Sequence, residues 1–129
     1  MTESQDKTPV RSFRDLLVWR KARALVRNVY TVTRAFPADE RFGLTNQLRR
    51  SAVPVPSNIA EGYGRGQRRD YVRYLQIARG SLFELQTQLL LAGDLGYITE
   101  ADAENCVEEA QAVFGLLQRR IRSLDKTEQ

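Results

Sequence analysis

The stretch RRDYVRYLQIARGSLFELQTQLLLAGDL, residues 68–95, decides the fold class of this sequence. Its apolar residues recur every three or four positions, which is the spacing that places side chains on one face of an α-helix. The residues of this stripe are Tyr71, Tyr74, Leu75, Ala78, Leu82, Leu85, Leu89 and Ala92. A helix buries such a stripe only against other elements, so the stretch predicts a helical core.

A first helix is predicted by a capping signature and is ended by a proline. Ser12 followed by Asp15 has the spacing of a capping box, and Pro37 stops a helix that runs to about Phe36. The apolar residues of this helix fall on one side, and its arginines fall together on the opposite side. These arginines are Arg20, Arg23, Arg27 and Arg34. Leu16 also falls on the basic side, and the helical pattern does not account for it.

Two prolines interrupt the segment that follows. A second helix is predicted for about residues 42–62, and Pro54 and Pro56 are predicted to kink it. A proline inside a helix removes a backbone hydrogen bond and clashes with the preceding turn, at a cost of about 3 kcal/mol. Glu61 is expected to pair with one of the arginines at residues 49–50 across this break.

The last helix completes the predicted fold. A capping signature at residues 99–102 predicts a fourth helix that runs to about Leu124. Four helices joined by short turns predict an all-α fold, an antiparallel up-down-up-down four-helix bundle. We predict that the bundle spans residues 13–124, between a disordered tail at residues 1–12 and a second tail at residues 125–129.

Charge is divided unevenly along the chain. Residues 11–79 hold fifteen Lys and Arg against five Asp and Glu, a net charge of +10, whereas residues 80–129 hold four against nine, a net charge of −5. Nearly all the positive residues are arginines, which bind phosphate oxygens with two parallel hydrogen bonds. This pattern predicts a surface that binds a polyanion, most simply RNA or DNA. The alternative is that the basic and acidic halves satisfy each other within or between subunits.

The composition disfavours an enzyme. The chain has no histidine, which is the usual general base near neutral pH and the commonest metal ligand. The single cysteine, Cys106, falls on the buried side of the fourth helix and is predicted to be a core residue. Acidic pairs such as Glu108 and Glu109 have no base or nucleophile beside them in the sequence. We therefore expect no catalytic activity, no cofactor and no metal site.

Residues 62–69 are predicted to form a glycine-rich connection before the third helix. Glycine-rich loops hold phosphates in nucleotide-binding proteins, but those loops follow a strand or end in a lysine and a Ser or Thr, and this sequence has neither pattern. A flexible turn is the favoured interpretation. Its arginines are a second candidate site for nucleic acid, and Tyr63 beside them is a candidate for stacking on a base. These arginines are Arg65, Arg68 and Arg69.

The third helix carries a second apolar stripe, formed by Val72, Phe83 and Leu90. This stripe lies about 100° around the helix from the first one, so one bundle face does not cover both. An uncovered apolar stripe is typical of an interaction surface. We predict that it forms the interface of a homo-oligomer.

The hydropathy of the chain predicts no association with a membrane. No apolar run approaches the roughly 20 residues that a membrane-spanning helix needs. The first twelve residues are polar and lack the apolar stretch of a signal peptide. The expected location is therefore the cytoplasm.

Three runs of residues carry a resemblance to a known family. The runs are FRDLLVW at residues 13–19, GLTNQLRRSAV at residues 43–53 and PSNIAEGYGR at residues 56–65. They resemble the four-helix-bundle proteins encoded in bacterial 23S ribosomal-RNA intervening sequences, whose relatives include the accessory variability proteins of diversity-generating retroelements. The resemblance covers about residues 13–122. It implies a four-helix protomer, a ring-shaped homopentamer, no known catalysis and a role with nucleic acid, with a reverse transcriptase as the partner of the retroelement relatives.

Two classes of function follow from the sequence. The first is a non-catalytic oligomer that binds RNA or DNA through its arginines, supported by the charge of the first half of the chain. The second is a protein adaptor or scaffold, for example for a reverse transcriptase, supported by the second apolar stripe of the third helix. Binding to nucleic acid that weakens with salt favours the first class.

Overall fold

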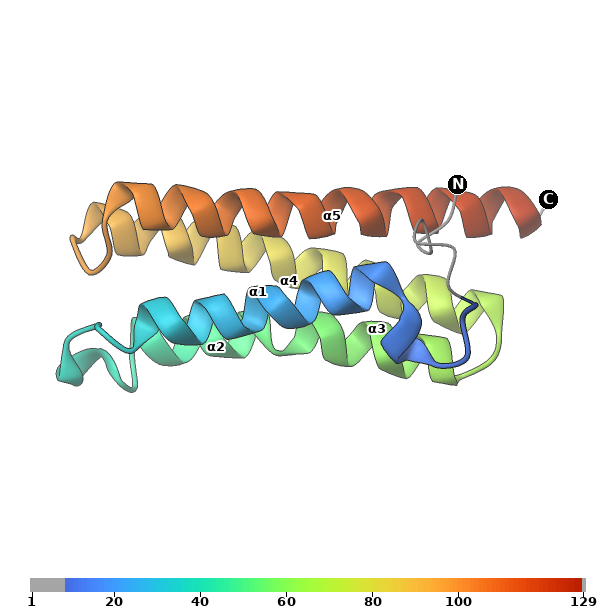
Figure 1. Ribbon diagram of the computed structural model, residues 1–129, viewed down its shortest axis with the longest axis horizontal. Coiled ribbons are helices and arrows are strands. Elements are labelled where there is room, and N and C mark those ends of the chain that lie inside the picture. The colour runs from blue at the N-terminus through green and yellow to red at the C-terminus, as the bar shows by residue number, and fades with distance from the viewer. Residues whose placement is uncertain (1–8, 129) are drawn as a thin grey trace.

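The computed structural model describes residues 9–128, and side chains as far as residue 125. These residues form helices and turns without any β-strand, which confirms the predicted all-α fold (Figure 1). The five α-helices are α1 (Leu17–Thr33), α2 (Leu44–Ala52), α3 (Pro54–Gly64), α4 (Arg68–Asp94) and α5 (Glu100–Glu128). Two short 3-10 helices, η1 (Phe13–Asp15) and η2 (Ala38–Glu40), precede α1 and α2.

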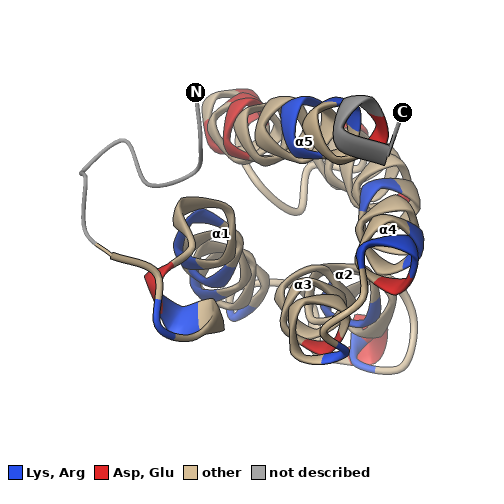
Figure 2. Ribbon diagram, turned by 90° about the vertical axis from the view of Figure 1, so that its right-hand side faces the viewer, with Lys and Arg blue, Asp and Glu red and all other residues tan. Residues whose placement is uncertain are grey.

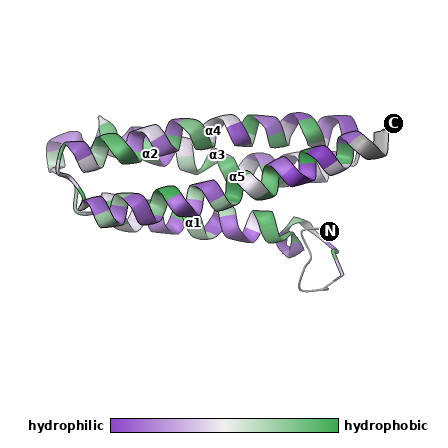
Figure 3. Ribbon diagram, turned by 90° about the horizontal axis from the view of Figure 1, so that it is seen from above, coloured by the Kyte–Doolittle hydropathy of each residue, from purple (hydrophilic) through white to green (hydrophobic). Residues whose placement is uncertain are grey.

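The helices form a four-helix bundle in which α2 and α3 together make one column. Seen along the bundle, α1 lies between α3 and α5, and α4 completes the square (Figure 2). The connections that follow α1 and α4 lie at one end of the bundle, and the connection between α3 and α4 lies at the other (Figure 1). Each long helix alternates between polar and apolar residues along its length (Figure 3).

The core is a single cluster to which every α-helix contributes. Each α-helix in turn contributes a fully buried large side chain: Leu25, Leu48, Ile59, Leu82 and Leu117. Burying a side chain of this size contributes about 1.5–3 kcal/mol relative to leaving it in water.

No helix of the described residues combines the length and apolar character that crossing a membrane requires.

The predicted first helix is divided in two at Leu16. The capping box forms, because Ser12 Oγ accepts a hydrogen bond from the N–H of Arg14 at 3.2 Å and the Asp15 carboxylate accepts one from the N–H of Ser12 at 3.2 Å. It caps only η1, after which Leu16 has extended backbone angles (φ −74°, ψ 127°). This break turns Leu16 out of the phase of α1 and into the core. The helix ends at Thr33, earlier than predicted.

The predicted kink lies at Val53, between α2 and α3. Pro54 is the first residue of α3, where a missing N–H costs least because the N–H groups of a first turn have no helical partner. Val53 keeps helical backbone angles (φ −57°, ψ −40°), so the column bends there without a loop. The side chains of Ser57 and Asn58 donate hydrogen bonds to the carbonyl oxygens of Val53 at 3.0 Å and Pro54 at 2.8 Å.

The connection between α3 and α4 is shorter than predicted, because Gly62 and Gly64 belong to α3. A Cβ atom on Gly62 would lie 2.7 Å from the Cβ of Tyr74, which is closer than real Cβ atoms approach. Gly62 is therefore a packing residue that lets α3 and α4 come together, and the prediction of a flexible turn was wrong at this position. The turn proper contains Gly66, whose φ of +78° is in the left-handed region that favours glycine.

The two C-terminal helices follow their predicted patterns closely. The first apolar stripe of α4 is buried, except that Tyr74 is only half-buried. Thr99 caps α5, since its Oγ1 accepts a hydrogen bond from the N–H of Asp102 at 3.0 Å. This helix continues past Leu124 to Glu128, so the predicted C-terminal tail is helical as far as the structure describes it. The predicted disordered tail lies largely outside the described residues, in residues 1–8.

Candidate nucleic-acid interface

Three of the four arginines predicted as a stripe belong to α1, and Arg34 follows its last residue; Figure 2 shows basic residues along this helix. Arg20, Arg23, Arg27 and Arg34 are all exposed. The guanidinium carbon of Arg23 lies 5.4 Å from the centre of the Trp19 ring, a cation–π distance. This contact holds one arginine of the stripe against a ring one turn earlier on the same helix.

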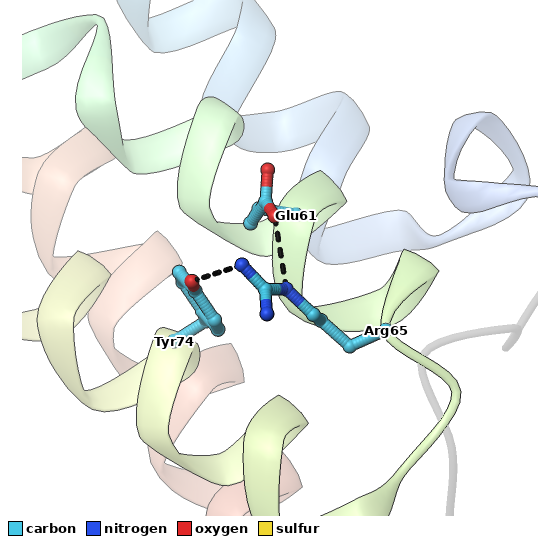
Figure 4. Close-up of polar contacts among 3 residues, drawn as sticks. All are labelled: Glu61, Arg65 and Tyr74. Carbon is cyan, nitrogen blue, oxygen red and sulfur yellow. Dashed lines mark hydrogen bonds and ion pairs between the residues drawn. The ribbon is translucent and has the colours of Figure 1, made fainter.

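Arg65 of the second predicted site already has partners within the chain. It donates hydrogen bonds to the Glu61 carboxylate at 3.0 Å and to the Tyr74 hydroxyl at 2.8 Å (Figure 4). The hydrogen bond that Arg65 donates to the Glu61 carboxylate raises the pKa of Arg65. Arg68 and Arg69 are exposed at the start of α4.

The pairing expected for Glu61 is therefore wrong. Its partner is Arg65, one helical turn further along, rather than one of the arginines at residues 49–50. Those arginines lie about twelve residues earlier on the same column, which is roughly 18 Å along its axis at 1.5 Å per residue. A glutamate side chain does not span that distance.

Two open grooves run between α1 and the column formed by α2 and α3. The groove against α3 has a volume of about 370 Å³ and is lined in part by Trp19, Arg23 and Arg27. The groove against α2 has a volume of about 690 Å³. We call this second one the α1–α2 groove. Its lining includes Tyr30, Arg41, Phe42, Arg49 and Arg50, and no carboxylate is among the described residues that line either groove.

Aromatic rings hold two of the arginines in the α1–α2 groove. The guanidinium carbon of Arg49 lies 4.3 Å from the centre of the Tyr30 ring, and its Nε donates a hydrogen bond to Thr33 Oγ1 at 3.0 Å. The guanidinium carbon of Arg41 lies 4.9 Å from the centre of the Phe42 ring. Neither arginine forms an ion pair with a carboxylate within the described part of the chain. No described carboxylate therefore neutralises the charge of either arginine.

The opposite side of α1 has the opposite charge. The groove between α1 and α5 is lined by Asp102, Glu108 and Glu109, together with Asn28, whose side-chain amide donates a hydrogen bond to Glu109. No arginine or lysine is among the described residues that line this groove. The uneven charge of the sequence thus becomes a basic flank and an acidic flank of one helix.

The residues of the predicted oligomer interface do not form one exposed stripe. Val72 is half-buried and packs against the core. Phe83 is 57% exposed, and its ring centre lies 5.1 Å from that of Phe114 on α5. Leu90 is 45% exposed and lies further along α4. Of these three residues only Phe83 and Leu90 are exposed, and Ile77, Leu91 and Leu95 are exposed apolar side chains of the same region.

The thiol of Cys106 lies in the core, 3% exposed, as predicted. Burial raises its pKa to about 11, and the carboxylates of Glu109 and Asp102 contribute to that increase. The thiol is therefore protonated at neutral pH and is a poor nucleophile. Within the described residues, no cluster of three or more His, Cys, Asp or Glu side chains is arranged to hold a metal ion.

Comparisons with known proteins agree with this fold. The model of the family described as 23S rRNA-intervening sequence protein matches residues 14–119. The chain belongs to this family. A crystal structure of a protein with unknown function from the S23 ribosomal protein family of Bacteroides thetaiotaomicron matches with a TM-score of 0.75. It is 23% identical and covers 81% of this chain and 97% of that one, which is a likeness of fold alone. No curated protein matches the chain.

In this member of the 23S rRNA-intervening sequence family, sequence reasoning missed the arginines of the α1–α2 groove. Arg41 and Phe42 stand next to each other in the turn before α2, and an arginine beside an aromatic residue is a recognisable signal. Arg49 gave no such signal, because Tyr30 and Thr33, which position it, lie on another helix. Only packing of α1 against α2 brings these three residues together.

Proposed function

We propose that the protein is a non-catalytic homo-oligomer that binds the backbone of RNA or DNA through its arginines. The observation that supports this proposal is the segregation of charge across α1, where the described residues that line the grooves on one flank include arginines and no carboxylate. Neutralising phosphates in this way releases the counterions condensed on the nucleic acid, and that release drives binding. Phosphate contacts carry little sequence information, so we expect similar affinities for different sequences of equal length.

The oligomeric part of the proposal rests on exposed apolar side chains of α4. Phe83 and Leu90 are large side chains about half exposed, which is costly in a monomer if they form part of a continuous patch. A homopentamer is what the resemblance to the intervening-sequence proteins implies. The cytoplasm is the location that we propose for this assembly.

The absence of a catalytic step is supported by the chemistry of the residues present. The sequence contains no histidine, and its single cysteine has a raised pKa in the core. A nuclease or phosphatase activity that copurifies with the protein, and is lost on substitution of one named residue, would contradict this part of the proposal.

The proposal is tested by titrating a labelled oligonucleotide with the protein at several salt concentrations. We expect binding that weakens steeply with salt. Replacing Arg23 and Arg27 together by glutamine should lower the slope of log affinity against log salt by up to about two units per protomer engaged. The absence of any salt-sensitive binding by the wild-type protein would overturn the proposal.

A matched control uses two arginines on another helix. The double variant Arg119→Gln with Arg122→Gln removes the same charge from exposed positions of α5, outside both basic grooves. We expect its salt slope to stay close to that of the wild-type protein. An equal reduction in both double variants would mean that net charge, rather than the flank of α1, determines binding.

A second candidate function is a protein adaptor that does not touch nucleic acid. The exposed ring of Phe83, which packs against the half-buried ring of Phe114, favours it, because aromatic residues are enriched at protein interfaces. A reverse transcriptase is the partner that the resemblance to retroelement accessory proteins suggests. A stable complex with that class of protein after nuclease treatment would support the adaptor.

A further inference from the structure

We propose that the α1–α2 groove is a binding site for an unpaired stretch of nucleic acid, in which a base stacks on Phe42 and the flanking phosphates bind Arg41, Arg49 and Arg50. This inference rests on the proposed function and adds to it a site and a preference for single strands. The sequence had placed the contacts elsewhere, on the outer face of α1 and on the connection before α4.

The ring of Phe42 is the first part of the argument. It is 82% exposed, the most exposed of the large apolar side chains that the structure describes. Leaving a phenyl ring in water is unfavourable, so its position at the mouth of a groove indicates a ligand with an apolar face. Arg41 lies against this ring at 4.9 Å, and a base stacked on the ring would complete a layered arrangement with the guanidinium.

The fixed orientation of Arg49 is the second part. Its contact with the Tyr30 ring and its hydrogen bond to Thr33 Oγ1 use one face of the guanidinium and the Nε atom. The two terminal nitrogens form no hydrogen bond with a described residue. A guanidinium that is already held in place loses little side-chain entropy when its free nitrogens bind a phosphate.

The charge of the groove is the third part. Arg41, Arg49 and Arg50 line it, and no carboxylate is among its described lining residues. Three positive charges without an acidic partner suit an anionic ligand, and the aromatic residues between them suit one that alternates phosphates with flat rings. A duplex keeps its bases stacked on each other, so only an unpaired strand offers both groups to this groove.

The experiment measures fluorescence anisotropy of three labelled probes of about 12 nucleotides: oligo(U) RNA, oligo(dT) DNA and a DNA duplex. We expect Phe42→Ala to weaken binding of the single strands by about 5- to 150-fold, the range found for losing one base stack. Binding of the duplex should change by less than about twofold. Phe42→Tyr should retain the affinity for single strands, because it keeps an aromatic ring. Comparison of the RNA and DNA probes identifies which strand the groove prefers.

A control variant removes an exposed apolar side chain elsewhere. Ile77→Ala, at a position of α4 that is 44% exposed and does not line the groove, should leave all three affinities unchanged. Circular dichroism and light scattering of every variant check that fold and assembly are retained.

The possible results separate this inference from the proposed function. Equal single-strand binding by Phe42→Ala and wild-type protein would overturn the groove site, while the proposed function stands. No binding of any probe by the wild-type protein at low salt would overturn both. A change in the mass of the oligomer on Phe42→Ala, with unchanged single-strand affinity, would make a second copy of the chain the occupant of the groove and would also overturn the inference.

Discussion

At the scale of single residues, Glu40 connects the two turns at one end of the bundle. Its Oε1 accepts a hydrogen bond from the N–H of Leu44 at 2.9 Å, which serves the first turn of α2. Its Oε2 accepts one from the hydroxyl of Tyr97, in the turn between α4 and α5, at 2.9 Å. Both bonds favour the ionised carboxylate, so they lower the pKa of Glu40, with the Leu44 bond as the larger cause.

We predict a dependence of stability on pH that comes from Glu40. A lowered pKa in the folded state contributes stability that is fully present above the unfolded-state value of 4.5 and is lost as the pH falls through the folded-state pKa. In urea unfolding, wild-type protein should therefore exceed Glu40→Gln in stability at neutral pH, and the difference should shrink below pH 4.5.

The control for this prediction is the neighbouring Asp39. It is exposed and forms no hydrogen bond with a described residue, so Asp39→Asn should show no such convergence with falling pH. A difference between wild-type protein and Glu40→Gln that stays constant down to pH 3 would contradict the role given to Glu40.

Gly62 gives a second prediction at the same scale. Gly62→Ala should lower the free energy of unfolding by about 1–3 kcal/mol, the usual cost of forcing an extra group into a packed contact. The added Cβ meets the Cβ of Tyr74, which cannot move without its helix. Gly80→Ala is the opposite case, because a Cβ on this exposed glycine of α4 meets nothing within 4 Å.

Gly80→Ala should stabilise the protein by about 0.5–1 kcal/mol, because alanine loses less backbone entropy on folding than glycine does. Both variants are measured by the same urea titration. If Gly62→Ala also stabilised the protein, the close approach of α3 and α4 at this position would be refuted.

At the scale of elements, α4 presents two faces with different roles. Leu82 is fully buried, whereas Phe83, the next residue, is 57% exposed. Successive residues point about 100° apart on a helix. A substitution at Leu82 therefore tests the core, and the same substitution at Phe83 tests the surface. The bundle buries Leu82 with the first apolar stripe of α4 and leaves Phe83 and Leu90 of the second stripe exposed.

We predict that Leu82→Asp prevents folding, whereas Phe83→Asp leaves the helical content nearly unchanged and dissociates the oligomer. A carboxylate at Leu82 would lie in the apolar core without a partner, which costs several kcal/mol. Circular dichroism and light scattering distinguish the two effects. Equal loss of helicity in both variants would show that Phe83 contributes to the core rather than to a subunit interface.

At the scale of the whole molecule, we propose that the apolar and the charged surfaces bind different partners. The apolar contacts of α4 hold subunits together, and the arginines flanking α1 bind a polyanion. These two interactions respond differently to salt, because screening weakens charge contacts but leaves apolar burial intact.

We therefore predict that the wild-type protein is an oligomer at micromolar concentration in both low and high salt, while nucleic acid dissociates as salt rises. Light scattering and anisotropy measured on the same samples test this. A monomer at every salt concentration would contradict the oligomer. Dissociation of the oligomer by salt would instead indicate that the basic flank of α1 pairs with the acidic flank of a neighbouring subunit.

The sequence by itself determined the helices, their capping residues, the bend of the second column and the division of charge. These features depend on periodicity and on residues close in the chain, such as Ser12 with Asp15 or Pro54 after Val53. Local patterns also predicted Leu82 in the core, because seven neighbours on the same helix repeat its spacing.

Only the tertiary structure decided how the helices meet. The burial of Leu16, the close approach at Gly62 and the contact of Arg49 with Tyr30 each depend on a residue or a break that periodicity does not encode. A helical pattern identifies which side of a helix is apolar, but the neighbour against which it packs, and at what rotation, is set by side chains far apart in the chain. The α1–α2 groove exists only because that packing places Tyr30 of α1 against Arg49 of α2, beside Arg41 and Phe42 in the turn before α2.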